Sequence, residues 1–78
     1  MTPEQVRAAR AILQWSVRKL AAEAELSPNT IISAEKGRHP LMPSTLKSLH
    51  LAFSRLGFRF EKLEDSIAVH FARTGESA

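Results

Sequence analysis

The stretch SVRKLAAEAELSPNTIISAEKG, residues 16–37, decides the fold of this chain. Its apolar residues recur at the spacing of a helix face, and a serine suited to capping a helix precedes each of its two periodic halves. Pro28 follows the second capping serine, and Gly37 offers the left-handed position at which helices commonly end. The stretch therefore predicts two short helices, 16–24 and 28–36, joined by a turn of about three residues.

Helical signals also flank this pair. Thr2 and Gln5 have the spacing of a capping box around Pro3, so a first helix is expected over 3–14. The segment 38–43 holds two prolines and is expected to be a loop, because proline disfavours the helical conformation of the residue before it. A fourth helix is expected over 44–56, where an apolar stripe is formed by Leu46, Leu49, Phe53 and Leu56.

Beyond Gly57 the apolar residues alternate with a period of two, which is typical of strands. Two short strands are expected on either side of the acidic turn Glu64-Asp65. Because an isolated two-stranded hairpin is marginally stable in water, these strands must pack on the helices or pair with a second chain. The candidate dimer interface lies on these strands and is formed by Phe58, Phe60, Ile67, Val69 and Phe71. Helix 44–56 could form the dimer contact instead.

Composition sets the general class of the protein. The 78 residues are enough for one compact domain, and 44% are hydrophobic and 24% charged, as in ordinary globular proteins. Residues 1–60 hold nine basic side chains against four acidic ones, whereas 61–78 hold two against four. The helical part of the chain therefore carries the charge that suits a polyanionic partner.

Four groups of residues stand in the register of a known family: Leu20-Ala21, Leu26-Ser27, Thr30-Ile31 and Glu35-Lys36-Gly37. In these positions the chain resembles the Cro and lambda-repressor-like (Xre-type) helix-turn-helix DNA-binding family. The resemblance implies a mainly α fold, a four-helix lambda-repressor-like helix-turn-helix domain with a C-terminal two-stranded β hairpin. We expect a DNA-binding domain over 1–57, a hairpin over 58–73 as the candidate dimerisation element, and a flexible tail over 74–78.

The resemblance also implies how the chain would meet DNA. In that family the helix after the turn lies in the major groove, and its first residues contact base edges. Asn29 is the strongest candidate for base readout, since one amide can bond N6 and N7 of adenine together, whereas capping alone also explains Ser27. The candidate base contacts are Ser27, Pro28, Asn29, Thr30 and Ser33, and the candidate phosphate contacts are Val17, Arg18, Lys36, Arg38 and Lys47.

One further contact and two departures follow from the same comparison. Arg10 and Glu35 resemble an ion pair that ties the first helix of the family to the recognition helix. Val17 stands where the family usually has Gln, so it lacks a side-chain donor for DNA. Glu25 stands where the family usually has Gly, so it must adopt or avoid a left-handed conformation that glycine takes readily.

Together these features predict a sequence-specific transcriptional regulator, with repression the expected action. It would bind double-stranded DNA as a homodimer at a two-fold symmetric site, since one small module contacts few base pairs. By resemblance, it would be bacterial or from a phage. Two alternatives stay open: an antitoxin that pairs with a toxin partner, and a protein-interaction module that keeps the fold as a scaffold.

Other classes of function lack support in the sequence. No cysteine is present, and His39, His50 and His70 have no ligand-spaced neighbours, so no metal or other cofactor is expected. An enzyme is not expected, because no phosphate-binding loop or glycine-flanked serine occurs. No apolar run approaches the roughly 20 residues that span a bilayer, so a cytoplasmic protein acting at the nucleoid is expected. Trp15 is expected to lie in the core.

Overall fold

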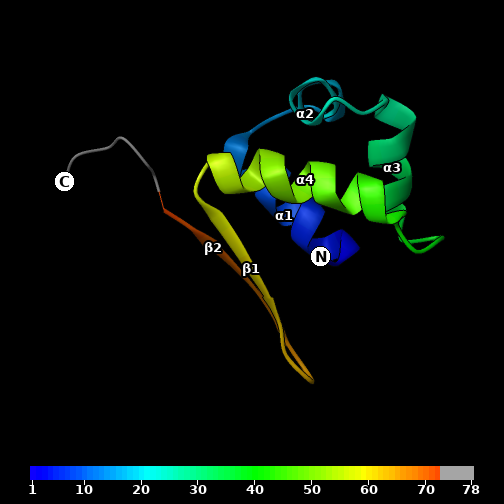
Figure 1. The fold of residues 1–78 in the computed structure, drawn as a ribbon. Coiled ribbons are helices and arrows are strands. Elements are labelled where there is room, and N and C mark those ends of the chain that lie inside the picture. Colours follow the sequence, from blue (N-terminus) through cyan, green and yellow to red (C-terminus); the bar gives the residue numbers. More distant parts are fainter. Residues whose placement is uncertain (73–78) are drawn as a thin grey trace.

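The computed structural model describes residues 1–72, which form four helices followed by a two-stranded antiparallel hairpin (Figure 1). None of the helices in this range has the length and apolar character needed to cross a membrane. The tail expected over 74–78 and the last residue of the hairpin unit, at 73, lie outside the described residues. The elements are α1 (Pro3–Leu13), α2 (Val17–Ala24), α3 (Pro28–Lys36), α4 (Pro43–Arg55), β1 (Phe58–Lys62) and β2 (Ile67–Phe71).

The helices begin where capping side chains satisfy their first N–H groups. Gln5 N–H donates to Thr2 Oγ1 (3.1 Å) and Thr2 N–H donates to Gln5 Oε1 (2.8 Å), which completes the expected capping box. Ser16 and Ser27 cap α2 and α3 in the same way. Helix α4 begins one residue earlier than expected, because Pro43 takes the first helical position, where a missing N–H has no cost.

Three successive helices end on a residue with left-handed backbone conformation. These residues are Gln14 and Glu25, both with φ of 58°, and Gly37, with φ of 67°. Glu25 therefore adopts the conformation for which a glycine is usual, at a cost of about 1 kcal/mol. The turn between α2 and α3 thus begins with a left-handed residue that is not glycine.

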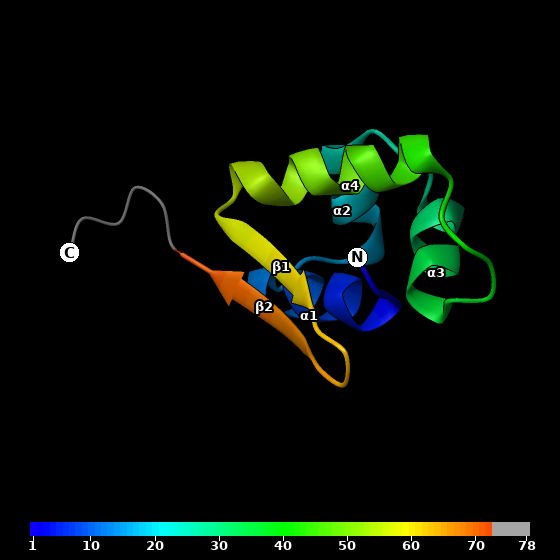
Figure 2. The ribbon, with the colours of Figure 1, turned by 60° about the horizontal axis from the view of Figure 1, so that its bottom comes forward.

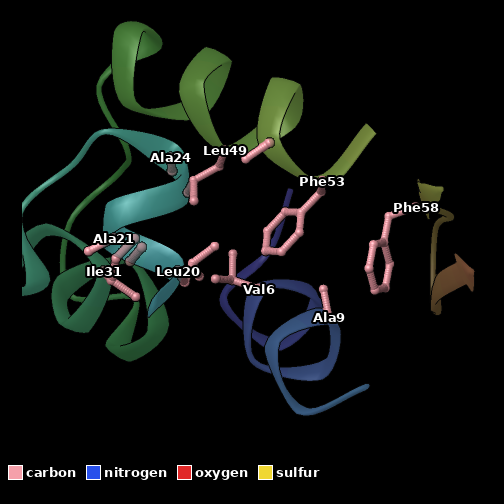
Figure 3. Packing of buried hydrophobic residues seen from close by; sticks show 11 residues of the cluster. Val6, Ala9, Leu20, Ala21, Ala24, Ile31, Leu49, Phe53 and Phe58 are labelled. Atoms are coloured by element: carbon pink, nitrogen blue, oxygen red, sulfur yellow. The ribbon is translucent and has the colours of Figure 1, made fainter. Parts of the chain in front are cut away.

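One apolar core lies between the four helices and the start of the hairpin (Figure 3). The ring of Phe53 points inward from α4, and its centroid lies 5.5 Å from that of Phe58 on β1. Small side chains on α2, Ala21 and Ala24, allow the neighbouring helices to approach closely. The largest fully enclosed apolar side chains are Val6, Leu20, Ile31, Leu49 and Phe53.

The hairpin packs one face on α1 and α4. Phe58 lies opposite Phe71, with ring centroids 4.5 Å apart, and Phe60 lies opposite Val69. The turn end of the hairpin extends away from the helices (Figures 1 and 2), which leaves Leu63 exposed. The apolar contacts of the hairpin with the helices therefore lie in its helix-proximal part.

The position of Phe58 does not fit its expected role at a dimer interface. Its side chain is only 5% exposed and belongs to the core of its own chain. The reason is that β1 follows α4 directly, so the first strand residue is carried onto Phe53. Of the other candidates, Phe60, Val69 and Phe71 are partly buried against the core, and Ile67 is exposed.

A buried amide fastens the hairpin to α1. Gln5 is 1% exposed, and its Nε2 donates to the carbonyl oxygens of Glu61 (2.7 Å) and Ala68 (3.0 Å), which lie opposite each other in the hairpin. Side chains at this level point to the far face of the sheet, because successive residues of a strand alternate, and this leaves room for the amide. One side chain thus completes the cap of α1 and holds both strands.

We expect the substitution Glu25→Gly to raise the free energy of unfolding by about 1 kcal/mol, because glycine adopts the left-handed conformation without a Cβ clash. Urea unfolding followed by circular dichroism measures the change. Ala22→Gly, an exposed position inside α2, is the matched control and should lower stability by about 1 kcal/mol. A destabilised Glu25→Gly variant would show that the Glu25 side chain supports the turn.

Candidate nucleic-acid interface

Helix α3 presents one polar face to the outside. Ile31, Ala34 and Glu35 are buried and define its inner face, whereas Asn29 and Ser33, one turn apart, are exposed. Pro28 is also exposed, at the first helical position. The amide of Asn29 and the hydroxyl of Ser33 are therefore accessible to a ligand.

The remaining residues expected to contact bases, Ser27 and Thr30, form hydrogen bonds with each other. Ser27 Oγ accepts a hydrogen bond from Thr30 N–H (3.2 Å), and the two hydroxyl oxygens lie 2.8 Å apart. Ser27 thus acts as the cap of α3, and half-buried Thr30 bonds to it. Of the predicted base contacts, Asn29 and Ser33 are therefore better placed than Ser27 and Thr30 to meet a ligand.

A shallow hollow of about 270 Å³ lies between α3 and the loop that leads to α4. Asn29, Thr30 and Ser33 form one side of it, and the loop, with the start of α4, forms the other. Met42, which is 69% exposed, adds an apolar group beside the polar face of α3. Sequence reasoning missed the wall formed by His39, Pro40, Leu41 and Met42, although the two flanking prolines signal a loop of restricted conformation.

Exposed cations surround this face. Residues 26–60 hold five basic side chains and a single acidic one, Glu35, which is buried. Arg59 pairs with Glu61 (3.4 Å), whereas the other four take part in none of the ion pairs within residues 1–72, so carboxylates of the same chain do not neutralise them. The four exposed cations among the predicted phosphate contacts are Arg18, Lys36, Arg38 and Lys47.

Glu35 joins α3 to α1 through its side chain and its backbone. Arg10 Nε lies 2.6 Å from Oε2 of Glu35, and Arg10 Nη2 donates to Oε1 (2.9 Å), so the expected ion pair is bidentate. Arg10 Nη1 also donates to the carbonyl of Trp15 (3.1 Å), and Arg7 donates to the backbone carbonyl of Glu35. These bonds fix the direction in which the first turn of α3 projects.

The ion pair changes the pKa of Arg10. The hydrogen bond to Glu35 raises the pKa of the guanidinium above its ordinary value, and the charge of Glu35 acts in the same direction against partial burial. A raised pKa contributes stability that is present below the unfolded pKa and lost only as pH rises through the folded value. Arg10 therefore contributes no pH dependence to stability near neutrality.

The end of α3 also touches the start of α1. A Cβ added at Gly37 would lie 2.8 Å from Cγ of Pro3, and Gly37 has a positive φ. Glycine is needed here for both reasons, because a side chain would be strained and would push the two helices apart. The contact supports the orientation of α3 set by Glu35.

The remaining predicted residues lie at the start of α2 and beside it. Val17 is half-buried against the core, so its backbone N–H at the helix N-terminus is the group it can offer to an anion. Trp15 packs against the core, as expected, with the ammonium of Lys19 5.4 Å from its ring centroid. Neither side chain extends the exposed polar face of α3.

Comparison with models of protein families found no match, and none was found among curated proteins. The functional assignment of this chain therefore depends on the geometry and charge of residues 1–72.

We expect Arg10→Met and Glu35→Gln each to lower the free energy of unfolding by about 2 kcal/mol, since each strands a partly buried polar partner. The value lies below that of a fully buried pair because the two side chains keep 26% and 10% exposure. The double variant should lose less than the sum of the singles, which a double-mutant cycle measures. Glu23→Gln, which removes an exposed ion pair with Lys19 and leaves the contact of Lys19 with Trp15 in place, is the control and should change stability by less than about 1 kcal/mol. Additive single effects would contradict the coupling.

Proposed function

We propose that this chain is a sequence-specific transcriptional regulator of the helix-turn-helix type, binding double-stranded DNA with α3 in the major groove. The observation that carries the proposal is the exposed first turn of α3, bordered by unpaired cations and free of exposed carboxylates. A groove-reading helix needs this combination, because base edges are reached by short polar side chains while the phosphates on both sides attract cations.

The proposed contacts divide between bases and backbone. Asn29 reads an adenine through two hydrogen bonds, and Ser33 lies one turn further along the same face. Pro28 and Met42 supply apolar groups for a thymine methyl. Arg18, Lys36, Arg38, Lys47 and the N–H of Val17 contact phosphates and set the register of the protein on the duplex.

The regulator acts as a homodimer on a two-fold symmetric site in this proposal. A single helix of nine residues contacts too few base pairs to select one site in a genome, whereas two copies double the number read. Repression is the proposed action, because it requires only that the protein occupy its site. Such a protein works in the cytoplasm, at the nucleoid.

We expect Asn29→Ala to weaken binding to the preferred sequence by about tenfold to a hundredfold and to relax the preference at one base pair. Selection of bound duplexes from a random pool, followed by titration, measures both effects. Ser54→Ala is the matched control, because this exposed residue lies near the end of α4 that points away from α3 (Figure 1). An unchanged sequence preference in the Asn29 variant would remove Asn29 from base readout.

We expect Lys36→Ala to reduce the slope of log affinity against log salt concentration by about one, as loss of a single phosphate contact does. Lys62→Ala on the hairpin removes the same charge far from α3 and should leave the slope unchanged. Failure of the folded wild-type chain to bind any duplex at low salt would instead favour a protein-interaction module with this fold.

A further inference from the structure

The hydrogen-bond register of the hairpin shows which backbone groups face outward. Leu63 N–H donates to the carbonyl of Ser66 (2.7 Å), and Ala72 N–H donates to that of Gly57 (3.0 Å). Bonded and non-bonded pairs alternate along an antiparallel ladder, so the positions opposite each other at 59 and 70 and at 61 and 68 are the bonded pairs. The N–H and C=O groups of Ile67, Val69 and Phe71 consequently point away from β1.

This edge of β2 is not covered by the rest of residues 1–72. No backbone hydrogen bond outside the hairpin ladder involves Ile67, Val69 or Phe71 within that range. Helices α1 and α4 contact the hairpin through its apolar face, and in Figures 1 and 2 no helix lies along the outer side of β2. The strand thus presents a row of unused donors and acceptors.

The two edges of the hairpin differ in charge. β1 carries Arg59, Glu61 and Lys62 among its five residues, whereas β2, with the sequence IAVHF, carries no Asp, Glu, Lys or Arg. Charged side chains, lysine above all, are the usual protection of a free strand edge against pairing. Only the edge of β2 lacks this protection.

We propose that β2 pairs with β2 of a second copy of this chain, antiparallel about a two-fold axis at Val69, to form a four-stranded sheet. This register places Val69 opposite the partner's Val69 and Ile67 opposite the partner's Phe71, so apolar side chains meet on one face of the sheet. Ile67, which is 41% exposed in the single chain, is one of these apolar residues. On the other face His70 meets the partner's Ala68, which brings no like charges together.

The same strand meets itself, as a two-fold interface requires. Gln5 holds both strands of each hairpin to α1, and α1 is tied to α3 by Glu35. The four-stranded sheet would therefore hold the two copies of α3 in a fixed orientation relative to each other. The interface rests on the proposed function, which requires a dimer, and it specifies how the two copies of that dimer meet.

The test is the molar mass of the full chain in solution without DNA, by light scattering over a wide range of protein concentration. We expect the wild type to be a dimer and Ile67→Pro and Val69→Pro to be monomers of unchanged helical content. Proline at these positions removes an outward N–H and no bond to β1. Lys62→Pro is the matched control, because its N–H faces outward on the opposite edge, and it should stay dimeric.

Three results would overturn the interface: a wild type that stays monomeric, Ile67→Pro and Val69→Pro variants that stay dimeric, or loss of the dimer in Lys62→Pro. A monomer produced by Leu51→Asp, on the exposed side of α4, with intact Ile67→Pro dimers would assign the contact to α4 instead.

DNA binding separates this inference from the proposed function. We expect the Ile67→Pro monomer to bind a two-fold site about a hundredfold more weakly while still binding a half-site, since it loses only the linkage of two modules. A wild-type dimer that binds no DNA would overturn the function and leave the interface standing. A wild-type monomer that binds DNA would overturn the interface and leave DNA binding standing.

Discussion

The bond between Glu35 and α1 is the constraint on which the rest of the arrangement depends. Glu35 is the single carboxylate of α3, and turning it inward removes negative charge from the exposed face while giving the helix a fixed partner. Two arginines on α1 hold its side chain and its carbonyl. The same interaction therefore orients α3 and leaves its outer face with positive charge only.

Much of the helical architecture could be predicted from the sequence, because its signals are local. Capping serines, prolines at first helical positions and the glycine at 37 place helix ends to within a residue or two. The period of two after Gly57 likewise indicates the hairpin. The Arg10–Glu35 contact was accessible only through resemblance to a family, since no local pattern joins residues so far apart.

The remaining features depend on contacts between distant parts of the chain. Nothing near Gln5 shows that its amide would reach the carbonyls of Glu61 and Ala68, because a capping box explains the residue fully. The burial of Phe58 depends on the angle at which β1 leaves α4, which periodicity does not encode. The loop wall beside α3 arises from the same kind of long-range placement.

Gln5 has a consequence for the dynamics of the molecule. Its oxygen serves the first turn of α1 and its nitrogen serves the middle of the hairpin, so neither site can open without weakening the other. Fraying of the amino-terminal helix and detachment of the strands are then one cooperative event rather than two. Amide protons in these two regions, more than 50 positions apart in the chain, should exchange with solvent at matched rates.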